Sequence, residues 1–452
     1  MPPAGSTPHV VYVAWGFPPC RGGGVYRALA TANRFAESGF RVTVLTATRE
    51  TFTRYTGADT SLEALVNPRI RVVRVPFDWP ALDADIRQWS LARAFAPRLW
   101  RKARAKLDVR DFPEIGYGPW KRPLTEAAQQ VHDADPVDLV VASANPNVDF
   151  AVAEYLNDHH DVPYVMDYRD AWTLDVFDGH QVHPDGSRVA LLENKLLGGA
   201  REVWFVNEPI RAWHQRRYPA IASRMHVVAN GYDPDFAPAP QLATRESRQP
   251  LRFGYIGTVS NKVPLGEFAA GWSLARARDP DLADATAEIW GYLGFYSTPS
   301  PGLVRLIEAH TDDGLAYVGP LPKQRVREVY DTFDALLLIL AAGIYVTSGK
   351  VFEYTASALP IVSVHDPLNA ASDVLRDYPL WFPVSDLEPE SVARALEAAT
   401  EAARSASPAV RERCRAFSQQ YSRDLQLAPR VSALAASLDF DPESMTTRVV
   451  RR

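Results

Sequence analysis

Residues 335–364 constrain the fold more than any other stretch of this 452-residue chain. The segment opens with an unbroken apolar run, residues 335–340, which is typical of a strand buried on both faces of a parallel sheet. After a loop, Ser348 or Thr347 can cap a helix that begins at Gly349. Pro360 ends that helix, and residues 361–364 follow as a second strand. This order predicts an α/β fold whose ligands bind where the strands end.

The start of the expected helix suits a phosphate group, because the first backbone N–H groups of a helix are unpaired and carry the positive end of its dipole. Glu353 lies one turn further on, and its side chain leans back toward the helix start. It can accept hydrogen bonds from ribose hydroxyls there. Alternatively, Glu353 pairs with Lys350 on an exposed face, and the sequence leaves both readings open.

Composition places the chain among ordinary globular proteins, with 46% hydrophobic and 23% charged residues. Its two cysteines, Cys20 and Cys414, form no disulfide or zinc pattern. The first nine residues lack the core of a signal peptide, and no apolar run reaches the ~18 residues of a membrane span. We therefore expect a cytoplasmic protein.

The first half of the sequence predicts an alternating α/β domain. The connection between the first expected strand and the first expected helix contains Gly22, Gly23 and Gly24, which do not form a dinucleotide fingerprint. These glycines either make a tight turn or let a ligand approach the backbone closely. The expected strands are residues 9–14, 41–46, 70–75, 137–142, 163–166, 203–206 and 225–228.

A second alternating series follows a Pro- and Ala-rich linker, residues 235–250, with strands expected at 252–256, 287–290, 315–318 and 335–340. We therefore predict two doubly wound, Rossmann-like domains that face a cleft. The first covers residues 1–235, with a helical insertion at about 80–125, and the second covers 250–420. The helical segment 421–452 is expected to cross back to the first domain.

Four short motifs, in this order, carry a resemblance to a known family. They are residues 18–24 (PPCRGGG), 167–172 (DYRDAW), 230–233 (NGYD) and 349–354 (GKVFEY) with Pro360. Together they resemble the retaining, nucleotide-sugar-dependent glycosyltransferases of the GT-B fold, family four, and look closest to the bacterial cell-envelope and natural-product branch.

The resemblance implies a role for each motif. Glu353 would hold the donor ribose, and Lys262 would neutralise the leaving diphosphate. Arg169 and Asp170 would act with Lys262 at the reacting centre, and Asn145 and Trp172 would lie on the acceptor side. No metal or cofactor is expected. Other donor contacts would come from Gly23, Gly24, Gly257, Thr258, Tyr317, Gly319, Leu321, Thr347, Ser348, Gly349 and Lys350.

The sequence also departs from the family pattern. Tyr345 stands where many members carry a glutamate, residues 258–261 just before Lys262 lack the arginine that many members carry there, and Arg169 replaces a frequent histidine. A nucleotide-sugar 2-epimerase of the same fold and a nucleotide-sugar binder with altered catalysis therefore remain alternatives. The base, the sugar, the acceptor and the oligomeric state stay open.

Residues 87–110 combine eight basic residues with one acid, Asp108. Trp89, Phe95, Leu99 and Trp100 lie between them. A basic segment of this kind can lie on an anionic bilayer at the inner face of the membrane, which would suit a lipid-linked acceptor. Alternatively its apolar residues pack on the first domain, and the acceptor is a small soluble molecule. Nucleic acid is not expected, because no nucleic-acid-binding fold accompanies the charge.

Overall fold

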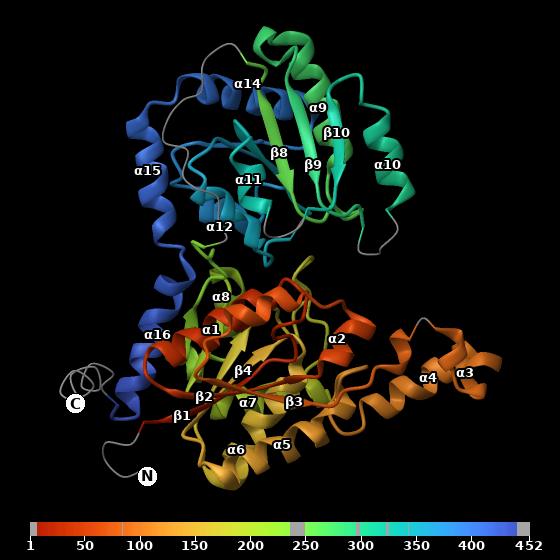
Figure 1. Ribbon diagram of the computed structural model, residues 1–452, viewed down its shortest axis with the longest axis vertical. Coiled ribbons are helices and arrows are strands. Elements are labelled where there is room, and N and C mark those ends of the chain that lie inside the picture. Colours follow the sequence, from red (N-terminus) through yellow and green to blue (C-terminus); the bar gives the residue numbers. More distant parts are fainter. Residues whose placement is uncertain are drawn as a thin grey trace. The chain divides into compact units, whose positions relative to one another are not determined.

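A computed structural model describes residues 7–83, 85–235, 249–294, 299–321, 325–341 and 343–440 of the chain. The chain divides into two compact α/β units (Figure 1). The first unit contains the chain up to Asp175, His180–Val228 and the segment from Leu427 onward, and the second contains Val176–Gly179 and Ala229–Gln426. Most of the expected linker lies outside the described residues. The prediction of two doubly wound α/β folds is confirmed.

The first unit is built on a seven-stranded, wholly parallel sheet in the order β3-β2-β1-β4-β5-β6-β7. Its central strands are buried along their whole length, which explains their continuous apolar sequences. The strands are β1 (His9–Val13), β2 (Arg41–Ala47), β3 (Ile70–Val75), β4 (Leu139–Ala144), β5 (Tyr164–Tyr168), β6 (Glu202–Phe205) and β7 (Met225–Val227).

Helices cover both faces of this sheet (Figure 1). The first helix and the last one share a core with β1, β2 and β4, so that residues such as Leu29 and Phe35 pack with Val431 and Leu434. The helices of this unit are α1 (Val25–Glu37), α2 (Arg49–Tyr55), α3 (Leu91–Phe95), α4 (Pro97–Asp108), α5 (Lys121–Ala134), α6 (Phe150–His160), α7 (Arg188–Gly199), α8 (Glu208–Arg217) and most of α16 (Arg423–Ser437).

The second unit contains a six-stranded parallel sheet in the order β10-β9-β8-β11-β12-β13. Separate apolar cores fill its two faces. The strands are β8 (Arg252–Ile256), β9 (Thr286–Trp290), β10 (Leu315–Gly319), β11 (Ala335–Ile339), β12 (Ile361–Val364) and β13 (Trp381–Pro383). The helices are α9 (Leu265–Arg278), α10 (Pro301–Glu308), α11 (Val326–Tyr330), α12 (Gly349–Ala356), α13 (Ala370–Leu375), α14 (Pro389–Ser405) and α15 (Pro408–Gln419).

The order of strands reverses direction at one place in each sheet. In the first sheet this switch lies between β1 and β4, and in the second between β8 and β11. Loops that follow the two strands at a switch diverge and leave space for a ligand at the carboxyl edge. Three of the four sequence motifs follow a strand at or beside a switch: the glycine loop follows β1, Asp167–Trp172 covers the end of β5, and the Gly349 helix follows β11.

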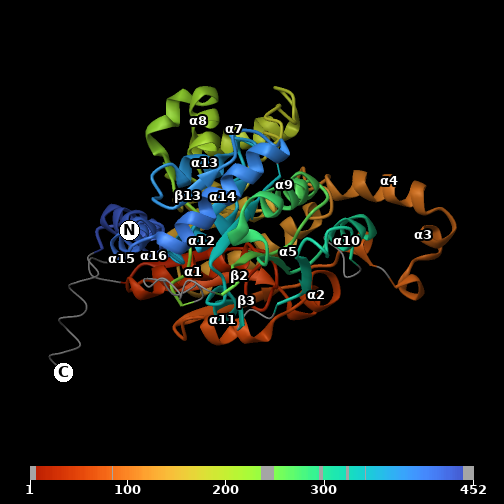
Figure 2. The ribbon, with the colours of Figure 1, turned by 90° about the horizontal axis from the view of Figure 1, so that it is seen from above.

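The helical insertion between β3 and β4 contains a hairpin of two helices, α3 and α4. Figures 1 and 2 show this hairpin projecting away from the remainder of the first unit. Its apolar residues were expected either to pack on the first domain or to face a membrane. The exposed fractions are 77% for Leu91, 86% for Phe95, 70% for Leu99 and 60% for Leu107, so these residues do not pack on the domain. Within the described part of the chain, no helix has the length and apolar character needed to cross a bilayer.

Candidate functional site

In the first unit, the glycine loop and the Asp167–Trp172 motif meet at Gly24. Gly24 is the residue that precedes α1, and its backbone is helical, so conformation alone does not demand glycine. A Cβ atom at this position would overlap the guanidinium of Arg169, whereas a Cβ at Gly23 would meet nothing within 4 Å. The absence of a side chain at Gly24 therefore makes room for Arg169.

The Arg169 guanidinium is held by main-chain carbonyls at the end of β4. Its Nε donates to Ala144 O at 2.8 Å and its Nη2 donates to Asn145 O at 2.9 Å. The side-chain amide of Asn145 donates in turn to Asp170 Oδ2 at 3.2 Å. The structure thus brings together Gly24, Asn145, Arg169 and Asp170. It also directs the Nε and Nη2 groups of Arg169 to the protein, so that Nη1 is the nitrogen that lies against Gly24.

Buried charges that the sequence analysis missed position this motif. Arg27, on α1, forms an ion pair with Asp167 at 2.6 Å, and Ser143 on β4 donates to the same carboxylate. The Glu193 carboxylate on α7 accepts from Thr173 at 2.6 Å and from Tyr168 at 3.0 Å. Each partner lies 20 to 140 residues away in the chain, and no local sequence pattern signals such pairs.

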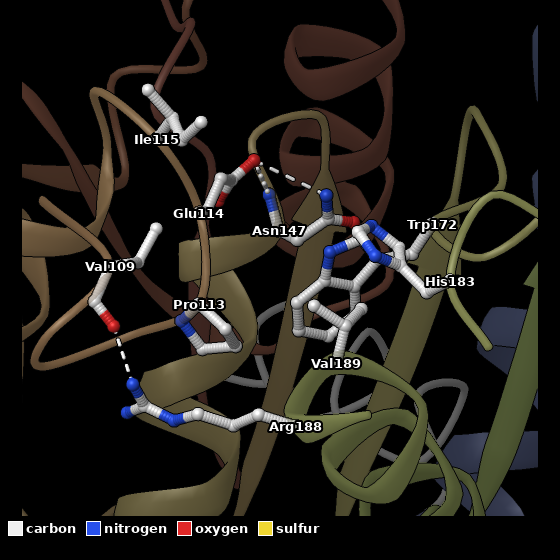
Figure 3. A pocket seen from close by; sticks show the side chains of 9 residues that line it. All are labelled: Val109, Pro113, Glu114, Ile115, Asn147, Trp172, His183, Arg188 and Val189. Carbon is white, nitrogen blue, oxygen red and sulfur yellow. Dashed lines mark hydrogen bonds between the residues drawn. The ribbon is translucent and has the colours of Figure 1, made fainter. Parts of the chain in front are cut away.

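A pocket with a volume of about 490 Å³ opens beside Trp172 (Figure 3). Trp172 itself is buried and stacks on Phe112, with ring centroids 5.3 Å apart. Most of the remaining wall is apolar. The lining residues are Val109, Pro113, Glu114, Ile115, Asn147, Trp172, His183, Arg188 and Val189.

Two carboxyl groups lie at the start of α6, close to this pocket. Glu114 accepts hydrogen bonds from the backbone N–H of Asn147 at 2.9 Å and of Val148 at 2.7 Å, and burial raises its pKa to about 7. Asp149 is fully buried and accepts from Trp15 N, and burial raises the pKa of its carboxyl well above the usual value. The sequence analysis proposed neither residue.

In the second unit, the predicted helix start is present. Ser348 precedes α12 and accepts from the backbone N–H of Lys350, while Thr347 is buried beside it. Gly349 is exposed, and a Cβ there would meet nothing within 4 Å, so a ligand can reach the helix start. Glu353 lies one turn on and accepts from Tyr330 at 3.4 Å.

The side chain of Lys350, a residue of α12, reaches the loop that follows β8. Its ammonium group donates to Tyr255 at 2.6 Å, and the Tyr255 hydroxyl donates to Thr258 O at 2.9 Å. The lysine stem crosses Gly257, where a Cβ would overlap Lys350 Cε and where the backbone φ of +138° already favours glycine. Lys350 thus joins the two loops at the switch of the second sheet, rather than pairing with Glu353.

Lys262 lies elsewhere in the second unit. It is exposed, and its ammonium group stands 4.3 Å from the ring centroid of Phe177. Tyr345, which replaces the expected glutamate, lies so close to Gly179 that a Cβ there would contact its ring at 2.8 Å. Of the two lysines, Lys350 is the one beside Gly257 and the helix start.

The residues expected to form the base pocket lie at the end of β10. The Tyr317 hydroxyl donates to Gly291 O at 2.9 Å, and Gly319 O accepts from Gly291 N at 2.8 Å. Leu321 packs against the core under β11. These contacts hold the end of β10 against the loop after β9.

Comparisons with known proteins identify the architecture. The model of the glycosyl transferase 4-like domain matches residues 22–231. A glycosyltransferase from Rickettsia africae has a TM-score of 0.62 at 13% identity, covering 95% of this chain and 98% of that one. Anabaena HepE, solved in complex with UDP-glucose, has a TM-score of 0.59 at 13% identity, with 95% and 99% covered. A candidate UDP-N-acetylglucosamine 2-epimerase from Listeria monocytogenes has a TM-score of 0.53 at 9% identity, with 96% and 97% covered. No protein of curated function matches the sequence significantly.

Proposed function

We propose that this chain is a GT-B glycosyltransferase of the family 4-like type, and that it transfers a sugar from a nucleotide-sugar donor to a hydroxyl acceptor with retention of anomeric configuration. The match of residues 22–231 to the glycosyl transferase 4-like domain supports the family. The observation that carries the donor half of the proposal is the accessible helix start at Gly349, with Lys350 and Glu353 beside it. A backbone N–H cluster, a cation and a carboxylate one turn apart match a diphosphate followed by a ribose.

In the reaction, the bond between the anomeric carbon and the diphosphate oxygen breaks, and the acceptor oxygen bonds to the same face of the sugar. The leaving phosphate gathers negative charge and takes the acceptor proton. Groups already oriented toward that charge lower the barrier, each contributing about 10²–10³-fold. We assign this role to the helix start and to Lys350, with Lys262 as the second candidate cation. Arg169 and Asp170 orient the sugar and the acceptor.

The donor test uses the intact protein with a panel of UDP-, GDP-, dTDP- and ADP-sugars. We expect slow release of one nucleoside diphosphate without added acceptor and faster release with one, and an anomeric product of unchanged configuration. Metal independence is part of the proposal, so activity should persist in EDTA. Loss of activity in EDTA and recovery with a divalent cation would overturn that part alone.

A nucleotide-sugar 2-epimerase is the second candidate, since the candidate epimerase from Listeria monocytogenes shares the two-unit fold. An epimerase needs no acceptor site. The same panel separates the two functions, because an epimerase converts one nucleotide sugar into its isomer without releasing nucleoside diphosphate. Tight binding without either product would instead identify a nucleotide-sugar binder.

We also propose peripheral contact with an anionic membrane through the α3–α4 hairpin. Leu99, Ala103 and Leu107 recur at four-residue spacing and are all exposed, so they form one apolar stripe along α4. Lys102 and Lys106 flank the stripe on the same helix. Exposed apolar residues next to free basic residues match the interface of a bilayer with anionic headgroups.

The hairpin is also held in a defined shape. Arg93 is buried, donates to main-chain oxygens of Pro80 and Asp83, and stands 4.0 Å from the ring centroid of Trp89. Arg104 pairs with the buried Asp108 at 2.6 Å. These two arginines therefore stabilise the hairpin, while Arg98, Arg101, Lys102 and Lys106 remain exposed on it.

A further inference from the structure

The pocket beside Trp172 contains one buried polar atom with no partner. Asn147 is 6% exposed, and its Nδ2 donates to Glu114 Oε1 at 3.2 Å. Both oxygens of the ionised Glu114 carboxylate also accept from backbone N–H groups, so in this form the NH2 end of the Asn147 amide faces Glu114. The other end, Oδ1, is buried and has no donor among the described residues. Figure 3 shows the Asn147 amide between Glu114 and the rings of Trp172 and His183.

The charged groups of the same pocket are already occupied. Both oxygens of Glu114 accept from N–H groups of residues 147 and 148. The guanidinium of Arg188 donates to the main-chain oxygens of Val109, Arg110 and Asp111. An anionic ligand would lie beside the Glu114 carboxylate and would have to compete with main-chain oxygens for the exposed Arg188 guanidinium. A cationic ligand would have to displace N–H groups from Glu114. A neutral ligand meets neither cost.

We propose that this pocket holds the acceptor, and that the acceptor is a neutral, largely apolar molecule whose hydroxyl or N–H group donates to Asn147 Oδ1. The volume of about 490 Å³ lies within the range of small-molecule sites. Ile115 and Val189 supply apolar contact at its wall, and Trp172, which stacks on Phe112, forms another part of that wall. A donor on the ligand satisfies an oxygen that otherwise lies buried and unpaired.

The role of the bound molecule as acceptor rests on the proposed transferase function. Its binding to the pocket does not, because binding can be measured without turnover. The probes are β-naphthol, which is neutral and carries a hydroxyl, naphthalene, which lacks the hydroxyl, and naphthoate, which is anionic. Isothermal titration with the intact protein is expected to give the tightest binding for β-naphthol. We expect naphthalene to bind about tenfold more weakly, the loss typical of one hydrogen bond to a buried acceptor, and naphthoate more weakly still.

Variants locate the binding. Asn147→Ala should remove the preference for β-naphthol over naphthalene. Ile115→Trp should fill the mouth of the pocket and weaken both probes by at least about tenfold, and it should fold normally because Ile115 is 65% exposed. Leu368→Trp is the matched control, an equally exposed aliphatic residue in the second unit, and it should bind β-naphthol as the parent does.

Naphthoate binding as tightly as β-naphthol, or binding that Ile115→Trp leaves unchanged, would overturn the pocket assignment. Failure of the proposed function has a different signature. In that case no nucleotide sugar is converted and no nucleoside diphosphate is released, while β-naphthol still binds and still responds to Ile115→Trp. If both functions hold, β-naphthol accelerates nucleoside diphosphate release and Ile115→Trp abolishes that acceleration.

Discussion

At the scale of single residues, Gly24 offers the sharpest test of the first unit, because a single methyl group added there would overlap the guanidinium of Arg169. Gly24→Ala should push the guanidinium away from the carbonyls of Ala144 and Asn145. Displacement of a positioning group by about 1 Å can lower turnover by roughly a hundredfold. We expect that loss in kcat, with a change in the free energy of unfolding of about 1–3 kcal/mol.

The neighbouring glycine provides the control. A Cβ at Gly23 meets no atom within 4 Å, so Gly23→Ala should retain turnover and stability if the effect at Gly24 comes from Arg169. Equal losses in both variants, measured by steady-state rates and denaturant unfolding, would mean that the loop needs glycine for its own conformation.

Glu353 tests the second unit. Glu353→Ala should weaken binding of the cognate nucleoside diphosphate by about 1.5–3 kcal/mol, the range for a hydrogen bond to a charged group. Tyr330→Phe is the matched variant, since it removes the hydroxyl that donates to Glu353 but leaves the carboxylate. Calorimetry should show a much smaller loss for Tyr330→Phe. A nucleotide dissociation constant that Glu353→Ala leaves unchanged would return Glu353 to a structural role.

Asp149 gives the protein a predictable dependence on pH. Burial raises the pKa of its carboxyl well above 3.8, so the folded protein keeps a proton that the unfolded chain has released. Between the pKa of the unfolded chain and the higher pKa of the folded protein, the native state binds more protons than the unfolded state. The free energy of unfolding therefore falls as pH rises through this range. Asp149→Asn removes this contribution, so its free energy of unfolding should fall less between pH 4 and pH 8 than that of the parent. The exposed Asp161 provides the control substitution Asp161→Asn, which should behave as the parent does.

Residue-scale inference from the sequence succeeded where the signal is local. Ser348, Gly349 and Glu353 belong to one helix start, and capping and spacing rules predict their placement. Arg27, Glu193 and Asn147 were missed because their partners come from distant strands, and a buried ion pair has no signature at either of its two positions. The family resemblance favoured Lys262 over Lys350 as the cation at the diphosphate, and that choice stays a prediction. Only the folded loop shows the stem of Lys350 crossing Gly257.

At the scale of elements, the strands were predicted well because the parallel sheets bury both faces. β3 and β8 have the expected limits, and β11 ends one residue earlier than expected. The segment expected to be helical from residue 421 onward begins as α16 at Arg423 and ends at Ser437, and residues 441–452 lie outside the described part of the chain. The orientation of α3 and α4 could not be predicted, because exposure depends on whether another surface covers the apolar stripe.

The hairpin prediction belongs to this scale. The full chain should sediment with vesicles of anionic phospholipid and not with neutral ones, and salt should weaken the binding because the attraction is partly electrostatic. Replacing Arg98, Arg101 and Lys102 by Glu should remove at least roughly 3 kcal/mol of attraction, at about 1 kcal/mol for each basic group lost. Arg93 and Arg104 are left intact, because they stabilise the hairpin.

Apolar contact is tested separately. Phe95→Ser with Leu99→Ser should also release the protein from anionic vesicles without lowering its stability, since both side chains are exposed. Leu368→Ser is the exposed control in the second unit. Absence of sedimentation at low salt would favour a soluble acceptor. A molecular mass that doubles with concentration and returns to that of the monomer on Phe95→Ser would identify a second copy as the partner of the hairpin.

At the scale of the whole molecule, the nucleotide base is the property that the sequence indicates least, because the base contacts expected at the end of β10 come largely from main-chain groups, such as those near Gly319, whose carbonyl accepts from Gly291 N. Main-chain atoms are the same for every residue type, and their positions follow from the fold of the entire second unit. A ligand screen therefore identifies the nucleotide base, which the side chains do not indicate. Of UDP, GDP, dTDP and ADP, the cognate nucleotide should stabilise the protein by about 2.7 kcal/mol at a hundred times its dissociation constant.

The same screen decides which lysine neutralises the diphosphate. If Lys350 does, Lys350→Met should reduce the stabilisation by the diphosphate strongly but change that by the corresponding nucleoside little, since the nucleoside lacks the charge. Lys262→Met should leave both nearly unchanged, because Lys262 is exposed and stands over Phe177. The free variants must first be compared in melting temperature, because Lys350→Met also removes the hydrogen bond to Tyr255. A diphosphate-specific loss in Lys262→Met, with Lys350→Met unaffected, would reverse the assignment and make Lys350 a structural link between the loops after β8 and β11.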